Sequence, residues 1–423
     1  MIIYQVLPRL WGRGKFSDWD APAFRYLKSL GTDAVWYTGI PRHASGKDYV
    51  KGSPGSPYAI SSYYDVNPYL ADDSASRIEE FKALVGRTHA AGLKVITDLV
   101  PNHVAPDCTD VPVHPYFDYD WTDTRKIDYS APGAWEAMKR IALFWAGLGV
   151  DGFRCDMAEL VPLEFLAWLT AEVRKEHPGF IFIAEVYDRA NYRPFIEKAG
   201  FDLLYDKSGF YDIVRGVITI NGSAAALTGN WQGLSDLQGN MLNFLENHDE
   251  QRLASPFFAG SPEKGYAALA YGALFNQASF MVYAGQELGE SAPESSDGRT
   301  SIFNMVRVGS LQDSPLPHKG NRVLARYRSI LKLASKLNPL PNWDLCYCNG
   351  GAPGFDAGRH SAFVRYGKGH AWTVLCNFSD AAARVTLGIP AELRDACGGF
   401  LPESVEIEAA PWDAGIKEFL LHL

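Results

Sequence analysis

GFRCD at residues 152–156, FIFIAE at 180–185 and MLNFLENHD at 241–249 decide the fold, because each is an apolar run followed by a carboxylate. Asp156 and Glu185 lie 29 residues apart, and Glu185 and Asp249 lie 64 apart. A (β/α)8 barrel uses about 31 residues per βα unit, so these gaps correspond to one unit and two units. We therefore expect the three acids at the C-terminal ends of strands of one barrel, where barrel enzymes keep their chemistry.

A fourth stretch of the same kind, KVITDLVPNH at residues 94–103, places Asp98 on a strand 58 residues before Asp156. One βα unit accounts for only about half of that gap. The sequence therefore predicts an insertion after the third barrel strand, at residues 103–130.

Apolar runs rich in β-branched and aromatic residues alternate with amphipathic stretches, as in successive βα units. The predicted strands are 3–8, 34–38, 95–99, 152–155, 180–184, 203–205, 241–245 and 280–283. After Asn338-Pro339-Leu340-Pro341 the pattern changes to short strand-like runs separated by Gly and Asn turns, the last of them at 418–423. We expect a catalytic barrel over residues 1–337 and a C-terminal antiparallel β-sandwich over 338–423.

The composition excludes several classes of partner. A formal net charge of -9 leaves no basic surface for nucleic acid. The chain has no run of 18 apolar residues to span a membrane. Its first residues read as a barrel strand without a signal peptide, and the six cysteines lack metal-ligand spacing. We expect a cytoplasmic protein with free thiols, and nothing in the sequence indicates an oligomeric state.

Two carboxylates on neighbouring strands can cleave a glycosidic bond, because this reaction needs an acid for the leaving oxygen and a nucleophile or base across the ring. Arg154 lies two residues before Asp156 on one strand face, and its charge should keep Asp156 ionised. Glu185 follows three apolar residues, a setting that should raise its pKa. A single Asp at a strand end is more often a helix cap. Three acids and an arginine in register indicate a site.

The four stretches resemble the signature regions of the alpha-amylase superfamily, glycoside hydrolase family thirteen, in order and spacing from Tyr4 to about Ser335. ENHDEQR at 246–252, IYQVLPR at 3–9, SPYAISSYYDVNP at 56–68 and YAGQELGE at 283–290 are further matches. The resemblance implies a retaining mechanism and the following roles: Asp156 as nucleophile, Glu185 as acid/base, Asp249 as transition-state support, His103, His248 and Tyr58 as contacts to the reacting sugar, and Asp98 as a scaffold for Arg154.

The sequence departs from the family pattern in three places, one of which is Ser62, where many relatives have an Asp. The insertion at 103–130 is short for the family's domain B, which makes a long walled cleft less expected. Met157-Ala158-Glu159-Leu160 follows Asp156, where many alpha-amylases have a Lys-His pair whose His also helps hold calcium. We expect no cofactor in the chemistry, with calcium at Asn102 possible through oxygen ligands from Asp107, Asp110, Asp118 or Asp120.

The leading interpretation is a retaining hydrolase of α-1,4-glucans or malto-oligosaccharides. A transglycosylase or isomerase on the same donor, such as a glucanotransferase or a trehalose-forming enzyme, would share every catalytic residue. A catalytically inactive amylase-like binding protein is the alternative from another class. The presence of Asp156, Glu185 and Asp249 together argues against it.

Overall fold

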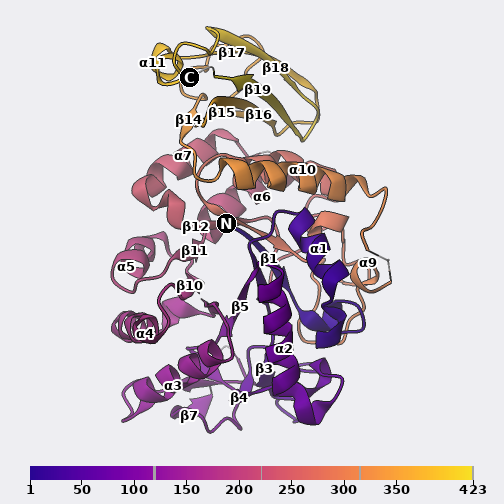
Figure 1. The fold of residues 1–423 in the computed structure, drawn as a ribbon, viewed down its shortest axis with the longest axis vertical. Helices are drawn as coiled ribbons and strands as arrows, with labels where there is room; N and C mark the ends of the chain where they lie inside the picture. The colour runs from indigo at the N-terminus through magenta and orange to yellow at the C-terminus, as the bar shows by residue number, and fades with distance from the viewer. Residues whose placement is uncertain (118–120, 221, 314–315, 422–423) are drawn as a thin grey trace.

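A computed structural model describes residues 1–423 apart from 118–120, 221, 314–315 and 422–423. Eight parallel strands close into a barrel in the order β1-β13-β12-β11-β10-β9-β5-β2 (Figure 1), which confirms the predicted (β/α)8 fold. The ends of these strands differ from the predicted ones by at most two residues. The strands are β1 (Ile2–Val6), β2 (Ala34–Tyr37), β5 (Lys94–Leu99), β9 (Gly152–Cys155), β10 (Ile181–Ala184), β11 (Leu203–Tyr205), β12 (Met241–Phe244) and β13 (Ser279–Tyr283).

Helices surround the barrel, and most of them turn an apolar face toward the strands, whereas α8 (Tyr266–Leu274) is buried along its whole length. In α10, for example, Asn321 caps the helix by accepting a 2.9 Å hydrogen bond from the Leu324 amide, and seven apolar residues of the helix are buried. The described helices of this layer are α1 (Ala21–Ser29), α2 (Arg77–Ala90), α3 (Ala134–Gly147), α4 (Leu163–Glu176), α5 (Tyr192–Glu197), α6 (Asp212–Ile220), α7 (Ala225–Leu234), α8 (Tyr266–Leu274), α9 (Gly309–Gln312) and α10 (Arg322–Leu337).

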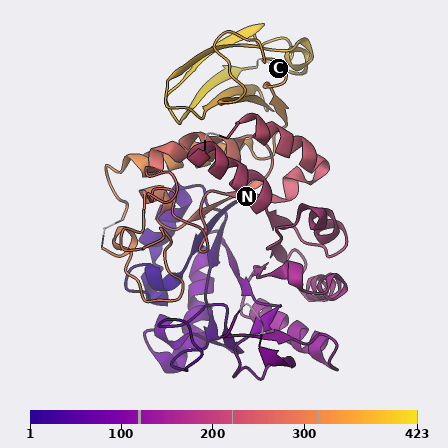
Figure 2. The ribbon, with the colours of Figure 1, turned by 180° about the vertical axis from the view of Figure 1, so that it is seen from behind.

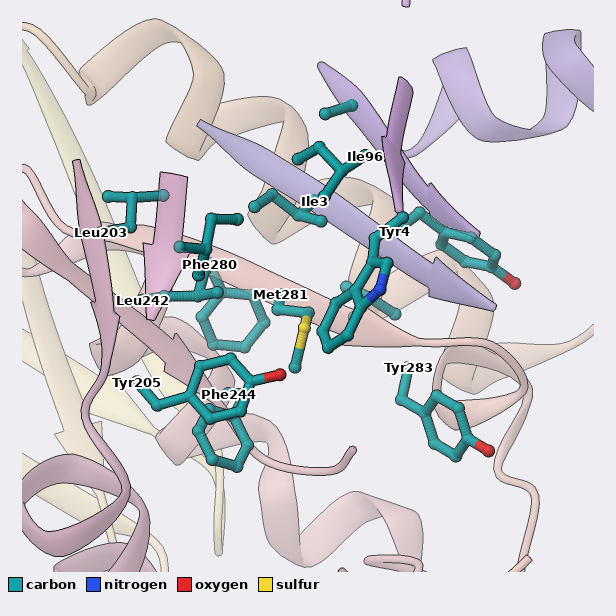
Figure 3. Close-up of a cluster of buried hydrophobic side chains, with 14 of the residues drawn as sticks. Ile3, Tyr4, Ile96, Leu203, Tyr205, Leu242, Phe244, Phe280, Met281 and Tyr283 are labelled. Carbon is teal, nitrogen blue, oxygen red and sulfur yellow. The ribbon is translucent and has the colours of Figure 1, made fainter. Parts of the chain in front are cut away.

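The barrel strands are almost entirely buried, as expected for a parallel sheet covered by helices. Figure 3 shows side chains of β1, β5, β11, β12 and β13 gathered into one apolar cluster, among them Ile3, Leu242 and Met281. This packing fixes the strand ends from which the site is built.

Two additions stand at the C-terminal ends of the strands. Strands β3 (Pro41–His43) and β4 (Ile60–Val66) form an antiparallel pair between β2 and α2. After β5, strands β6 (His103–Val104), β7 (Val113–Phe117) and β8 (Arg125–Ile127) form a small sheet in the order β6-β8-β7. This sheet lies within the predicted insertion.

After α10 the chain forms the predicted antiparallel sheets. Strands β14 (Asn342–Asp344), β15 (His360–Gly367), β16 (His370–Asn377) and β19 (Ala414–Leu420) make one sheet, and β17 (Ala383–Gly388) and β18 (Ser404–Ala409) make another. The predicted last strand at 418–423 overlaps β19, which begins four residues earlier, in a partly exposed stretch that lacks apolar alternation. Residues 422–423 lie outside the described part. A short helix, α11 (Ala391–Ala396), was not anticipated.

These sheets sit at one end of the molecule against the barrel helices (Figures 1 and 2). Buried Arg365 on β15 reaches back and donates to the carbonyls of Leu274 at 2.5 Å, Asn276 at 2.8 Å and Leu340 at 2.6 Å. The division at residues 337 and 338 stays a prediction. Among the described residues, no helix has both the length and the apolar character needed to cross a membrane.

Candidate active site

The acids predicted from the sequence meet at one end of the barrel. Asp156 directly follows β9, and Glu185 directly follows the neighbouring strand β10. The Asp156 amide donates to the Leu99 carbonyl at 2.9 Å, and the Glu185 amide donates to the Cys155 carbonyl at 3.2 Å, so both acids continue the ladder of the sheet. Asp249 follows β12 after a turn held by the Asn247 side chain, which accepts from the Asp249 amide at 2.9 Å.

Arg154 joins the two acids. Its Nη1 donates to Asp156 Oδ1 at 2.6 Å, and its Nη2 lies 2.9 Å from Glu185 Oε2. The Arg154 side chain is fully buried, and those of Asp156 and Glu185 are nearly so. One guanidinium therefore holds both carboxyl groups in place away from bulk water.

A second layer of groups holds Arg154. Its guanidinium lies 5.5 Å from the ring centre of Trp36, 5.3 Å from that of Tyr58 and 5.5 Å from that of Tyr205. Asp98 Oδ1 accepts from Arg154 Nη1 at 3.4 Å, and Asp98 Oδ2 accepts from the Trp36 indole at 3.1 Å. Asp98 thus supports Arg154 and is itself buried.

Burial has the largest effect on the pKa values of Asp156 and Glu185. Burial raises the pKa of Asp156 to about 6, although Arg154 opposes the shift. Arg154 favours the ionised form of Asp156, as expected, but desolvation outweighs the ion pair, so the net pKa shift is upward. Burial also raises the pKa of Glu185, and the negative charges of Asp156 and Asp249 add to this effect, as expected.

Two further donors fix the carboxyl group of Glu185. The Met157 amide donates to Oε2 at 2.7 Å, and the Tyr187 hydroxyl donates to Oε1 at 2.7 Å. Met157 adopts a left-handed backbone conformation with φ of 45°, which for a residue other than glycine is strained and is common at functional sites. The turn after β9 therefore positions Glu185, which follows β10.

Glu159 connects the same two turns a second time. Its Oε2 accepts from the Tyr187 amide at 3.1 Å, and its Oε1 accepts from the Asp188 amide at 3.0 Å and from the Asn191 side chain at 2.8 Å. Glu159 stands in the segment where the sequence departs from the family's Lys-His pair. The Glu159 carboxylate therefore connects the turn after β9 to the turn after β10.

His248 and Tyr58 lie on the other side of Arg154. The Gln5 side-chain amide donates to His248 Nδ1 at 2.7 Å, so the ring proton lies on Nε2. That nitrogen is 2.5 Å from the Tyr58 hydroxyl and 3.0 Å from Asp249 Oδ2. The Tyr58 ring stacks on His248, with centres 5.2 Å apart.

His103 approaches Asp156 from the insertion side. Its Nε2 lies 3.8 Å from Asp156 Oδ2, and its Nδ1 contacts the Asn102 amide nitrogen at 3.1 Å. All the residues predicted for the site therefore gather around Asp156 and Arg154.

Asp249 differs from the other two acids in exposure, because 41% of its side chain is accessible. Desolvation opposes ionisation, but His248, Arg154 and Arg299 outweigh it and lower the pKa of Asp249 below its ordinary value. Beside it lies a cavity of about 1280 Å³, lined by His248, Asp249 and the loop between residues 290 and 313. The loop after β13 therefore forms one wall of the cavity beside Asp249.

Asn102, Asp107 and Asp110 are the described residues among those named for a possible calcium site. Asn102 Oδ1 is buried without a hydrogen-bond partner and is one suitable oxygen. However, Asp107 accepts from the Ser61 hydroxyl at 2.9 Å and Asp110 accepts from the Tyr63 amide at 2.6 Å, and the part of the chain that the structure describes contains no group of three His, Cys, Asp or Glu placed to hold a metal. Asp118 and Asp120 lie outside the described residues.

Sequence reasoning missed Gln5, Trp36, Glu159 and Tyr187. Gln5 had a usable signal, since it is a fully buried polar residue in an otherwise apolar strand. Glu159 was noted only as a departure from the family. Its partners are amides of another turn, and their positions depend on the fold.

Comparison with known proteins agrees with this geometry. The family model described as Alpha amylase, catalytic domain, matches residues 22–110 and 109–308. An alpha-1,4-glucan:maltose-1-phosphate maltosyltransferase of Cereibacter sphaeroides is 30% identical over 240 residues, which are 48% of this chain and 39% of that protein. Alpha-amylase MalA of Haloarcula japonica is 29% identical over 328 residues, 68% of this chain and 44% of that protein. The chain spans less than half the length of these relatives.

Solved structures share the fold over the whole chain. The alpha-amylase of Lactobacillus plantarum superimposes with a TM-score of 0.75 at 22% identity, covering 99% of this chain and 98% of that one. The cyclic alpha-maltosyl-(1→6)-maltose hydrolase of Arthrobacter globiformis also gives a TM-score of 0.75, at 17% identity and with the same coverage. At these identities the likeness concerns the fold.

Proposed function

The chain belongs to the alpha-amylase family, and on that premise we propose that it is a retaining glycoside hydrolase that cleaves α-1,4-glucosidic bonds in starch-type glucans or malto-oligosaccharides. The observation that carries the proposal is the single guanidinium of Arg154 shared by Asp156 and Glu185. Retaining glycosidases need their two carboxyl groups close together, on opposite sides of the scissile bond.

In the first step, ionised Asp156 attacks C1 of the sugar while protonated Glu185 gives its proton to the glycosidic oxygen, which leaves with the bonding electrons. The product is a glycosyl ester on Asp156. In the second step, the Glu185 carboxylate takes a proton from water, the water oxygen bonds to C1, and Asp156 leaves as a carboxylate. The raised pKa of Glu185 supports its protonated form in the first step.

Asp249, His248 and His103 surround Asp156 with groups that can bond sugar hydroxyls. Tyr58 offers an aromatic face, although only 8% of it is exposed. We assign these four residues to the sugar whose C1 reacts, because they surround Asp156. Arg154 and Asp98 act by holding the acids.

Transfer to a sugar acceptor is the second candidate function, and the maltosyltransferase relative supports it. The chemistry is the same, with a sugar hydroxyl in place of water in the second step. Product analysis on maltoheptaose, with and without glucose as acceptor, separates the two. Hydrolysis predicts new reducing ends at the same rate in both reactions. Transfer predicts longer or isomeric products that increase with the acceptor.

We further propose that the reaction needs no calcium, since the chain lacks the family's His after Asp156 and its insertion at 103–130 is short. A metal that binds only the native state at a thousandfold excess over its Kd stabilises by about 4 kcal/mol. Treatment with EDTA should therefore leave activity and melting temperature unchanged. A fall of several degrees that calcium, and not magnesium, reverses would contradict this.

We place the protein in a reducing compartment such as the cytoplasm. Cys155 supports this, because it is buried beside Asp156 and burial raises the pKa of its thiol, which keeps it protonated and unreactive. A disulfide mapped on native protein would contradict the placement.

A further inference from the structure

The ring order of the barrel gives the bound sugar chain a direction. Glu185 follows β10, and β10 lies four strands from β1 in either direction around the ring. The acid donates to the oxygen of the leaving group, which in an α-1,4-glucan is the reducing-end part of the chain. The part that stays on Asp156, with the non-reducing end, therefore extends away from β10 toward β1 and its neighbours β2 and β13.

Two loops meet on that side. The first, residues 52–55, lies between β3 and β4, and the second, residues 303–305, follows β13. Pro54 and Asn304 form an antiparallel bridge. The Met305 amide donates to the Ser53 carbonyl at 2.7 Å, and the Gly55 amide donates to the Phe303 carbonyl at 3.4 Å. We refer to this contact between residues 52–55 and 303–305 as the seam.

The seam crosses the end of β1. It joins loops that follow the strands on either side of β1, and Arg9, just beyond β1, donates from Nη2 to the Ser301 carbonyl at 2.8 Å. Arg9 is buried beneath it. The loops are therefore connected to each other and to the barrel, so that the donor side of the site has a fixed boundary.

The cavity beside Asp249 is bordered by one half of the seam. Its lining includes Phe303, Asn304 and Met305, the same residues that form one half of the seam. With about 1280 Å³, it exceeds the roughly 300–1,000 Å³ of an ordinary ligand pocket. It therefore has room for a short saccharide, and the seam stands where a longer chain would have to continue.

We propose that this protein acts on the non-reducing ends of α-glucans, with the seam as the barrier that excludes the interior of a chain. The inference rests on the proposed function and adds the mode of attack to it. A chain end enters the cavity between Asp249 and the loop of residues 290–313, and a short unit is transferred to Asp156. Glucans without a free end have no productive way to bind.

The first test compares the nitrophenyl glycoside of maltoheptaose with the same compound capped by an ethylidene group on its non-reducing glucose. End-acting cleavage predicts that the cap lowers kcat/KM by about 100-fold or more, because a bulky group must fit against the seam. Cyclomaltoheptaose, which has no ends, should be equally poor. Capped and uncapped substrates cleaved at rates within about threefold of each other would overturn the inference and leave the proposed function standing. No product from either substrate would overturn both.

A glycine in the seam allows a matched pair of variants. At Gly52, with φ of 69°, an added Cβ would clash with the Phe303 carbonyl and lie 2.7 Å from Asn304 Oδ1. At Gly46, with φ of 64°, an added Cβ would meet nothing within 4 Å. Both substitutions by alanine carry similar backbone strain, but only Gly52→Ala pushes the two loops of the seam apart.

We expect Gly52→Ala to raise the ratio of capped to uncapped kcat/KM by about tenfold, and Gly46→Ala to leave it unchanged. Equal ratios in both variants would contradict a barrier role for the seam. Should Gly52→Ala fail to fold, the comparison of capped and uncapped substrates on the wild-type protein still decides the inference.

Discussion

On the β9–β10 side of the barrel mouth, Asp156 and Glu185 are buried and share the guanidinium of Arg154. On the β12–β13 side, Asp249 leaves 41% of its side chain exposed beside a cavity of about 1280 Å³. Backbone amides and the carboxylate of Glu159 link the turns of the first side. On the second side, the loop of residues 290–313 lines the cavity.

The difference separates two tasks. Groups that make and break bonds gain most from fixed geometry and low dielectric, because their charges then need no reorganisation during the reaction. Groups that receive a sugar must stay accessible. Changes on the β9–β10 side should therefore act on the chemical steps, and changes on the β12–β13 side on substrate choice.

Replacing the nucleophile gives the largest expected effect. Asp156→Asn keeps the shape of the side chain and removes the attacking charge, so kcat should fall by about 10⁴-fold or more with the melting temperature nearly unchanged. Asp249→Asn, on the open side, should retain at least about tenfold more activity than Asp156→Asn, because Asp249 forms no bond to the sugar carbon. Activity of Asp156→Asn within tenfold of wild type would exclude Asp156 as nucleophile.

Replacing the acid gives the next largest effect. Glu185→Gln should lower kcat/KM on malto-oligosaccharides by about 10³-fold, because the leaving oxygen no longer receives a proton. An α-glycosyl fluoride needs no protonation of its leaving group, so the loss measured on it should be far smaller. Equal losses on both substrates would contradict an acid role for Glu185.

The acidic limb of the pH profile tests the electrostatics of the buried side. The pKa of Asp156 is raised to about 6, and the residue attacks only when ionised, so activity is present above this pH and is lost as the pH falls through it. Below the pKa, kcat/KM should fall about tenfold per pH unit. Asp249→Asn should move this limb to lower pH, since the negative charge of Asp249 helps to raise the pKa of Asp156. A profile that stays flat to pH 4 would contradict the assignment.

Glu159 gives the smallest of these effects, since it acts only through the turn that carries Tyr187. Glu159→Ala should lower kcat on malto-oligosaccharides by about tenfold with little change in KM, and lower it less on a glycosyl fluoride, because the misplaced group is the acid. Glu164→Ala removes a nearby exposed carboxylate and is the control. A loss that is equal for both substrates, or equal in both variants, would assign Glu159 a purely structural role.

The strands and the acids could be predicted because both depend on local pattern. Apolar runs mark buried parallel strands, and an acid that directly follows such a run must lie at the end of the barrel. The partners of Glu159 and the seam could not be predicted. They join backbone groups of different turns, such as Ser53 and Met305, and their meeting follows from loop conformations that no side-chain pattern encodes.

The segment that forms the wall of the site also could not be predicted from the sequence. The short insertion at 103–130 made a long walled cleft less expected from the sequence. The structure instead walls the site with the loop after β13, a stretch with no apolar periodicity. Similarly, Arg154 could be placed beside Asp156, but the net pKa shift depends on burial, which spacing does not reveal.

The central claim, double displacement through Asp156, is tested most directly by trapping the intermediate. The protein would be incubated with 5-fluoro-α-glucosyl fluoride, which slows release of the glycosyl group, then digested with trypsin and sequenced by mass spectrometry. Our account predicts one added fluoroglucosyl group, on Asp156 in the peptide that begins at Cys155. A label on any other residue, or full turnover of the fluoride to a β-anomeric product without a labelled protein, would contradict it.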